Sequence, residues 1–150
     1  MALILCIETS TTVCSVALAQ NHRVLGALRE DTPNAHSTLL TVLIEKLLAK
    51  AGYQAEDLDA VAVSSGPGSY TGLRIGVSVA KGICFATGKP LIAITSLEIL
   101  AAHFLQQRPD VSAQDLLCPM IDARRMEVYS VLYRSNLTVE REVQIGRAHV

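Results

Sequence analysis

Residues 64–76, SSGPGSYTGLRIG, have the composition of a phosphate-binding loop, because four glycines and several hydroxyl residues stand ahead of an apolar run. A Walker A loop requires Gly-Lys-Ser/Thr after a gap of four residues, but Thr71 follows Gly66 at that spacing and the next lysine is Lys81. The dinucleotide pattern G-x-G-x-x-G also meets Thr71 where its third glycine should stand. The stretch therefore predicts a strand, a turn and a helix, whose N-terminus near Ser69 is at most a weak anion site.

Helix packing explains the same glycines without any ligand. Gly72, Gly76 and Ala80 are four residues apart, so they share one face of a helix and let another backbone approach closely. We favour this interpretation, because glycine turns and stripes of small residues are commonly structural. It predicts that Gly76→Leu disrupts pairing with a partner protein before it unfolds the lobe.

The other residues that could do chemistry form no recognisable catalytic set. Glu8 and the four hydroxyl residues after it could hold a nucleotide or a metal at a strand end, but a hairpin turn rich in Ser and Thr explains them as well. Asp122 allows the same two interpretations. No cluster of His, Cys and acids has metal-ligand spacing, and the sequence has no Gly-x-Ser-x-Gly elbow. We expect no catalytic residue and no metal site, with Glu8 and Ser69 as weak cofactor-binding candidates.

The composition is that of a folded protein with an aliphatic core. Half of the 150 residues are hydrophobic, and the formal net charge is −1, which implies no broad attraction to nucleic acid or anionic membranes. The four cysteines are far apart in apolar runs and form no C-x-x-C pair. The N-terminus lacks the basic region of a signal peptide, and no apolar run reaches transmembrane length. These features predict a cytoplasmic protein with reduced thiols.

Short apolar runs divided by small polar turns predict an antiparallel meander, after which the hydrophobic period changes to that of helices. The order β-β-β-α-β-α-β-α predicts an α/β lobe, with helices covering a mixed sheet. The predicted strands are 3–9, 13–19, 23–30, 58–65 and 89–95. Three helices are predicted: the first begins at Pro33 and ends at Gly52, the second covers 70–87 and is closed by Gly88, and the third covers 96–107 with Ser96 as N-cap.

Residues 116–134, LLCPMIDARRMEVYSVLYR, resemble the opening of the chain, since an apolar strand ends in an acid and a second strand begins after a short turn. Two ordinary hairpins or a duplicated fold would both give this pattern. We expect an N-terminal lobe at 1–108 and the start of a second, truncated lobe at 109–144. Residues 145–150, IGRAHV, match what a common sequencing adapter would encode, and we interpret them as a non-native tail.

The helix predicted at 70–87 has more apolar surface than one sheet face needs, since its apolar residues point almost all round it. Either the lobe covers this helix fully or part of it is an interaction surface. With the helix at 35–51 beside it, the second alternative predicts a helical docking face. The apolar residues in question are Leu73, Ile75, Val77, Val79, Ile83 and Phe85.

The block GPGSYTGLRIGVSVAKGICFATGKPLIAITSLEILA (66–101), the opening LILCIETSTTVCSVAL and the helix start NAHSTLL together resemble the TsaB (YeaZ) family of tRNA threonylcarbamoyladenosine biosynthesis proteins. The resemblance covers residues 3–144. It implies an actin/sugar-kinase/Hsp70-like fold of two related lobes. It also implies assembly with the paralogue TsaD, which transfers the threonylcarbamoyl group to tRNA, with the ATPase TsaE, and with a second copy of the chain.

The resemblance points to a non-catalytic scaffold subunit. TsaD-like proteins carry a metal-binding His-Met-Glu-Gly-His motif, but here the equivalent residues are Ser96-Leu97-Glu98-Ile99-Leu100, where a hydroxyl and an alkyl group replace the ligands. Glu8 stands where many members have Asp. ATP, threonylcarbamoyl-AMP and a metal would then belong to the wider pathway or complex. The partner interface that the resemblance and the apolar surplus imply comprises His36, Leu39, Leu43, Leu47, Tyr70, Gly72, Leu73, Gly76, Val77, Ala80 and Ile83.

Two other functions stay open. The glycine loop and Glu8 would suit a nucleotide-dependent kinase-like enzyme, or a peptidase of the kind this superfamily was once labelled with. A direct tRNA-binding module is disfavoured by the near-neutral charge and by the lack of a basic and aromatic strip, since Arg124 and Arg125 are the only adjacent arginines.

Overall fold

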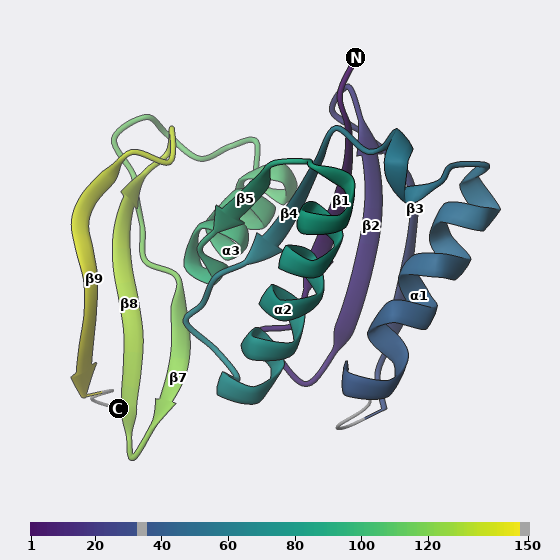
Figure 1. Ribbon diagram of the computed structural model, residues 1–150. Coiled ribbons are helices and arrows are strands. Elements are labelled where there is room, and N and C mark those ends of the chain that lie inside the picture. Colours follow the sequence, from purple (N-terminus) through teal and green to yellow (C-terminus); the bar gives the residue numbers. More distant parts are fainter. Residues whose placement is uncertain (33–35, 148–150) are drawn as a thin grey trace. The chain divides into compact units, whose positions relative to one another are not determined.

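The computed structural model describes residues 1–32 and 36–147 (Figure 1). The chain forms two compact units. Unit 1 contains residues 1–65 and 69–94, and unit 2 contains residues 66–68 and the chain from 95 onward. Within the described residues, no helix is both long and apolar enough to cross a membrane.

Unit 1 is built on a mixed five-stranded sheet in the order β3-β2-β1-β4-β5. Its first three strands form an antiparallel meander, and β4 and β5 extend it in parallel with β1. The α/β lobe and its strand order along the chain are confirmed. The strands are β1 (Leu3–Glu8), β2 (Cys14–Gln20), β3 (Arg23–Glu30), β4 (Ala60–Ser64) and β5 (Leu91–Ile94).

Two helices, α1 (His36–Ala51) and α2 (Tyr70–Thr87), pack with the short helix η1 (Ala55–Asp57) on unit 1's sheet (Figure 1). Side chains alternate between buried and half-buried along β1, so one face of the strand enters the aliphatic core. Burying each large aliphatic side chain of that core contributes about 1.5–3 kcal/mol. The predicted start of α1 at Pro33 lies outside the described residues.

The glycines of α2 let the helix approach the end of β1. A Cβ atom at Gly72 would overlap the carbonyl oxygen of Thr9, and one at Gly76 would overlap Thr9 Oγ1. Gly72, Gly76 and Ala80 are all buried within unit 1. The packing interpretation is confirmed, and the expectation for Gly76→Leu is corrected: added bulk at this position meets Thr9 of the same unit, so it should destabilise the lobe first.

Unit 2 contains α3 (Ser96–Gln107) and an antiparallel sheet in which β8 pairs with all three other strands. Leu97 and Ala101 of α3 share a buried cluster with Val131 and Tyr133 of β8. The two units divide after Ile94, because the apolar face of α3 packs on this sheet. The division into lobes at 1–108 and 109–144 stays a prediction. The strands are β6 (Leu116–Leu117), β7 (Met120–Arg124), β8 (Glu127–Arg134) and β9 (Val139–Arg147).

Two further details differ from or extend the sequence predictions. The N-cap of α3 is Thr95 and not Ser96: Thr95 has extended backbone angles, and its Oγ1 accepts a hydrogen bond of 3.1 Å from the N–H of Glu98. Residues 145–147 continue β9 alongside β8, and 148–150 lie outside the described residues. The interpretation of residues 145–150 as a non-native tail stays a prediction.

Candidate functional site

The glycine-rich turn before α2 uses its polar groups within the chain. Ser69 caps the helix, since its Oγ accepts a hydrogen bond of 3.3 Å from the N–H of Gly72. The N–H of Ser69 donates to the carbonyl oxygen of Ser10 at 2.7 Å. A capped helix start has fewer free donors for an anion. Ser69, a weak cofactor-binding candidate, therefore has a structural role at this position.

Glu8, the other weak candidate, closes the turn after β1. Its Oε1 accepts a hydrogen bond of 2.6 Å from the N–H of Ser10, and the N–H of Thr9 donates to Ser64 Oγ at 3.4 Å. Thr9 Oγ1 is buried without a hydrogen-bond partner among the described residues, where it faces Gly76. These contacts are those of a packed hairpin turn. Nowhere in residues 1–32 and 36–147 do three His, Cys, Asp or Glu residues gather as a metal site.

Three of the four cysteines are poor nucleophiles, and the fourth, Cys118, is exposed. Burial raises the pKa of the thiols of Cys6, Cys14 and Cys84, and the charge of Glu30 raises that of Cys14 further. A raised pKa keeps a thiol protonated and unreactive at neutral pH. Cys118 alone among the described residues is an exposed free thiol.

The exposed face of α2 is a stripe of aromatic and basic residues directly opposite the buried glycine face. Tyr70 is 74% exposed and Phe85 is 92% exposed, although both are large and apolar. Arg74 and Lys81 lie between them and are also exposed. We call this set, Tyr70, Arg74, Ser78, Lys81 and Phe85, the α2 stripe.

Unit 1 has one hollow beside the α2 stripe and a separate groove where α2 faces α1. The shallow hollow, of about 390 Å³, is lined by Leu73 and Val77, next to Tyr70. The groove, of about 490 Å³, is lined by Val79 and Ile83 of α2 and by Ile44 of α1, and it includes no residue of the α2 stripe. A surface of this kind, apolar and hollowed beside an exposed helix, suits a helix of a partner protein.

The residues predicted for the partner interface fall into three groups. Tyr70, Leu73 and Val77 line the hollow beside the α2 stripe. Ile83 lines the groove between α1 and α2, and Leu39 and Leu43 are half-buried on α1. Four others face the interior of unit 1 and cannot offer a free surface in this structure: Leu47, Gly72, Gly76 and Ala80. The side chain of His36 lies outside the described residues. The sequence prediction omitted Arg74 and Lys81, because charged residues on an exposed helix face carry no signal of their own.

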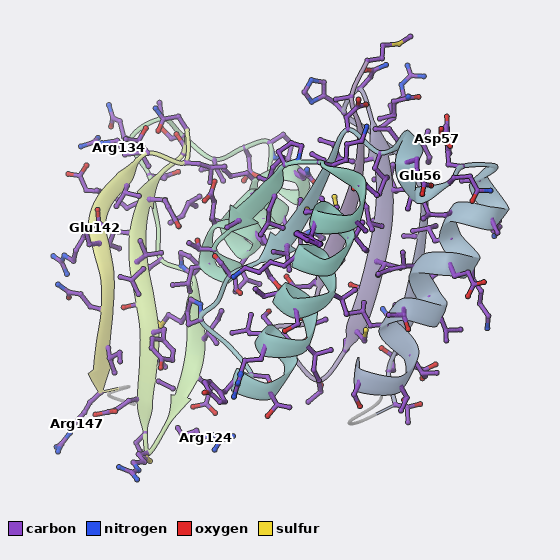
Figure 2. All side chains as sticks on the ribbon, in the orientation of Figure 1. Glu56, Asp57, Arg124, Arg134, Glu142 and Arg147 are labelled. Carbon is purple, nitrogen blue, oxygen red and sulfur yellow. The ribbon has the colours of Figure 1, made fainter. Side chains whose placement is uncertain are left out.

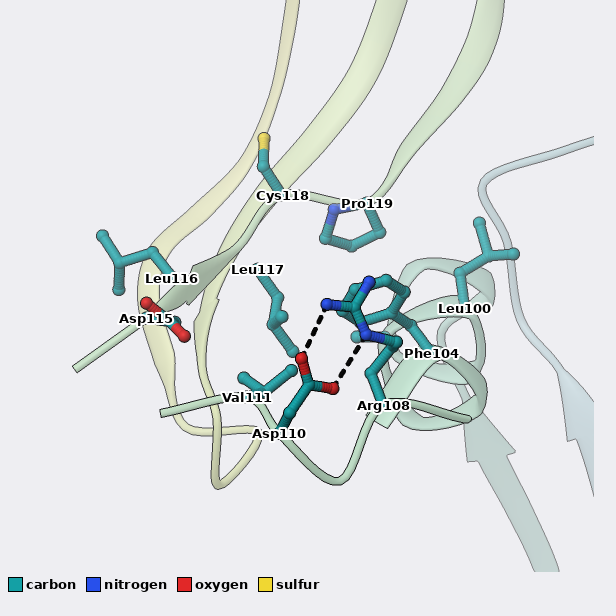
Figure 3. A pocket seen from close by; sticks show the side chains of 11 residues that line it. Leu100, Phe104, Arg108, Asp110, Val111, Asp115, Leu116, Leu117, Cys118 and Pro119 are labelled. Carbon is teal, nitrogen blue, oxygen red and sulfur yellow. Dashed lines mark hydrogen bonds and ion pairs between the residues drawn. The ribbon is translucent and has the colours of Figure 1, made fainter. Parts of the chain in front are cut away.

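Unit 2 has a pocket of about 600 Å³ between α3 and β6 (Figure 3). Leu100, Phe104 and Leu116 line it and are 43–50% exposed. At its rim, Arg108 and Asp110 form two hydrogen bonds of 2.8 Å, which lower the pKa of Asp110 to about 2. The two charges pair with each other, so the pocket presents mainly an apolar surface.

Comparison with known proteins supplies a family context for these features. A family model described as "TsaD: tRNA N6-adenosine threonylcarbamoyltransferase" matches residues 11–148. The chain is 36% identical over 134 residues to "tRNA threonylcarbamoyladenosine biosynthesis protein TsaB" of Bacillus subtilis, a match that covers 87% of this chain and 55% of the relative. The chain thus spans about half the length of the curated relatives it matches.

Solved structures agree with the sequence matches. "YeaZ from Pseudomonas aeruginosa" superimposes with a TM-score of 0.84 and 32% identity, covering 97% of this chain and 66% of that one. The activator of 2-hydroxyisocaproyl-CoA dehydratase from Clostridium difficile matches with a TM-score of 0.51 and 17% identity, over 97% of this chain and 45% of that one. The second likeness concerns the fold alone, and it confirms the expected actin/sugar-kinase/Hsp70-like class.

Proposed function

Because this chain belongs to the TsaB/YeaZ family of tRNA threonylcarbamoyladenosine biosynthesis proteins, which is related to TsaD, we propose that it is a non-catalytic subunit of the tRNA-modifying complex. In this role it binds a TsaD-type threonylcarbamoyltransferase and supports its activity. The TsaE-type ATPase joins the same complex, and tRNA is met through the complex. No cofactor is assigned to this chain, and ATP, threonylcarbamoyl-AMP and a metal act elsewhere in the pathway.

The α2 stripe is the observation that carries the proposal. Tyr70 and Phe85 are exposed on the face of α2 opposite its buried glycines, where a partner surface would bury them. Aromatic residues and arginine are the side chains most enriched at the energetic centres of protein interfaces. The shallow hollow beside the stripe, lined by Leu73 and Val77, gives a partner side chain a recess to fill.

The residues available for chemistry support a subunit without activity of its own. Glu8 and Ser69 are committed to a turn and a helix cap. Ser96 and Leu100, at the positions that correspond to the metal ligands of TsaD-like proteins, are a buried hydroxyl and a half-exposed alkyl group. Neither side chain is a good ligand for iron or zinc.

Direct binding tests the proposal. The purified chain and the TsaD-type protein encoded in the same genome should form a complex in size-exclusion chromatography and isothermal titration. The chain alone should leave tRNA unmodified. It should also bind ATP and magnesium only weakly, and Glu8→Gln should leave that binding unchanged. Transfer of threonylcarbamoyl to tRNA by the chain alone would show that it is an enzyme and refute the proposal.

A further inference from the structure

The hairpin between β7 and β8 ends in a turn whose residues do not suit its backbone. The strand ladder closes at the pair Arg124 and Glu127, so the two-residue loop is Arg125–Met126. The φ angles of Arg124, Arg125 and Met126 are 67°, 55° and 64°. Left-handed backbone is unfavourable for residues with a Cβ atom, and hairpin loops with positive φ at both central positions prefer Asn, Asp and Gly. Arg125 and Met126 therefore make this turn less stable than those residues would.

A second turn in the same chain has residues that fit the same backbone. The hairpin between β2 and β3 also closes with a two-residue loop, Asn21–His22, between the paired residues Gln20 and Arg23. The φ angles of this loop are 50° and 64°. Asn and His are enriched at positive φ, whereas Arg and Met are not. Residues that break a local preference without a gain in stability mark candidate functional positions, and the tip of the β7–β8 hairpin is one.

We propose that the tip of the β7–β8 hairpin, Arg124, Arg125 and Met126, binds backbone phosphates of the tRNA that the complex modifies. The inference rests on the proposed function, which it deepens by giving this chain a contact with the RNA substrate. The two guanidinium groups hold phosphate oxygens, because the planar fork of arginine matches the geometry of a phosphate. Contacts of this kind position a nucleic acid without reading its sequence.

Both guanidinium groups of the tip are available for phosphate. Arg124 and Arg125 are exposed, and within the described part of the chain no ion pair involves either one. Asp122 Oδ1 accepts a hydrogen bond of 2.8 Å from the main-chain N–H of Arg124, and Glu127 is half-buried opposite Arg147 of β9. Figure 2 shows Arg124 and Arg147 at the same end of the unit 2 sheet. Because Arg147 belongs to the segment interpreted as a non-native tail, the proposal rests on Arg124 and Arg125.

An RNA backbone fits the tip better than a protein surface does. Residues 124–127 include no aromatic side chain, and Tyr and Trp are the usual anchors of protein interfaces. Met126 is 73% exposed, and its flexible side chain can pack against a ribose or a base beside the phosphates. The base of the hairpin is held in the core of unit 2, where Val131 and Tyr133 of β8 are buried. Two phosphate contacts on a chain of net charge −1 are too few to hold RNA alone, so the contact operates within the complex.

Exchange of the loop residues tests whether the turn is unfavourable. Arg125→Asn/Met126→Gly gives the loop the residues preferred at positive φ, so it should raise the urea midpoint of unfolding. Asn21→Arg/His22→Met makes the reciprocal exchange in the β2–β3 loop and should lower the midpoint. An unchanged or lower midpoint for Arg125→Asn/Met126→Gly would remove the reason to assign a function to the tip and would overturn the inference.

The salt dependence of tRNA binding tests the phosphate contact. The complex of this chain with the TsaD-type protein of the same genome is titrated with fluorescent tRNA between about 50 and 200 mM KCl. Arg124→Gln/Arg125→Gln should weaken tRNA binding about tenfold, and it should reduce the slope of log K against log[KCl] by about 0.7–0.9 for each arginine removed. Arg23→Gln/Arg29→Gln, the same charge change at exposed positions of β3, is the matched control and should leave the affinity and the slope unchanged.

The possible results distinguish this inference from the proposed function. Equal tRNA binding by Arg124→Gln/Arg125→Gln and by the control would overturn the inference and leave the proposed function standing. A complex that forms but does not bind tRNA would also overturn it. Loss of the complex with Arg124→Gln/Arg125→Gln in size-exclusion chromatography would show that the tip contacts protein, again against the inference. No complex even with the unchanged chain would instead contradict the proposed function.

Discussion

The contact between Gly76 and Thr9 allows a sharp prediction about how α2 is held in unit 1. A Cβ atom at position 76 would overlap Thr9 Oγ1 and would lie 3.3 and 3.4 Å from Thr9 Cβ and Cγ2. Overpacking of this kind costs about 1–3 kcal/mol, and the higher helix propensity of alanine offsets about 1 kcal/mol. We therefore expect Gly76→Ala to lower the free energy of unfolding by up to about 2 kcal/mol.

The same helix supplies the matched control. A Cβ atom at Gly82 would meet nothing within 4 Å, so Gly82→Ala keeps the gain in helix propensity without the overlap. This variant should raise the free energy of unfolding by about 1 kcal/mol. Urea unfolding followed by circular dichroism measures both variants, and Gly82→Ala should be more stable than Gly76→Ala by about 1–3 kcal/mol.

A double-mutant cycle tests the proposed cause of the loss. Thr9→Ala removes the buried Oγ1, which has no hydrogen-bond partner among the described residues, and leaves 3.3 Å as the closest contact to an alanine at position 76. The pair Thr9→Ala/Gly76→Ala should recover at least half of the loss caused by Gly76→Ala alone. Purely additive effects, or a stabilising Gly76→Ala, would refute the assigned close approach of α2 to β1.

Three further predictions concern other parts of the chain. Thr95→Ala should destabilise unit 2 by about 1 kcal/mol in urea unfolding, because it removes the N-cap of α3. Ser96→Ala should cost much less, because Ser96 Oγ has no hydrogen-bond partner among the described residues. The hydrogen bonds and charge of Arg108 lower the pKa of Asp110 to about 2. The contribution of Asp110 to the free energy of unfolding should therefore be complete above its unfolded pKa near 4 and vanish as the pH falls toward 2. Asp110→Asn should remove this pH dependence in unfolding measured from about pH 6 to about pH 2. Cys118 should react with a thiol reagent in the native protein much faster than Cys14, and equal rates would contradict the described burial.

Local patterns in the sequence were sufficient to predict most of the fold. The apolar runs and polar turns predicted the meander and its crossovers, and Gly88 ends α2 with a positive φ of 68°, as a C-cap glycine does. Adjacent hydroxyl residues made the N-cap of α3 ambiguous, and only the backbone angles identify Thr95. The division into units after Ile94 could not be predicted from the sequence, because the contact of α3 with β8 joins residues about 30 positions apart, which no local pattern encodes.

The candidate site could be predicted only in part. Apolar residues all round α2 indicated an interaction surface, but such a helix gives no hydrophobic period from which to tell its inward from its outward face. The prediction therefore placed Gly72, Gly76 and Ala80 at a partner interface, whereas the end of β1 covers the glycines. Which face is free depends on tertiary packing, and the two cations of the α2 stripe were visible only after that face was known.

Reconstituted tRNA modification tests the central claim most directly. Threonylcarbamoyl transfer to tRNA should be measured with the TsaD-type protein of the same genome, the TsaE-type ATPase and threonylcarbamoyl-AMP, with and without this chain. We expect full activity only when the chain is present, and a marked loss when Arg74→Glu or Phe85→Ala replaces it. Transfer that is equally fast without the chain, or transfer by the chain in the absence of the TsaD-type protein, would contradict its assignment as a supporting subunit.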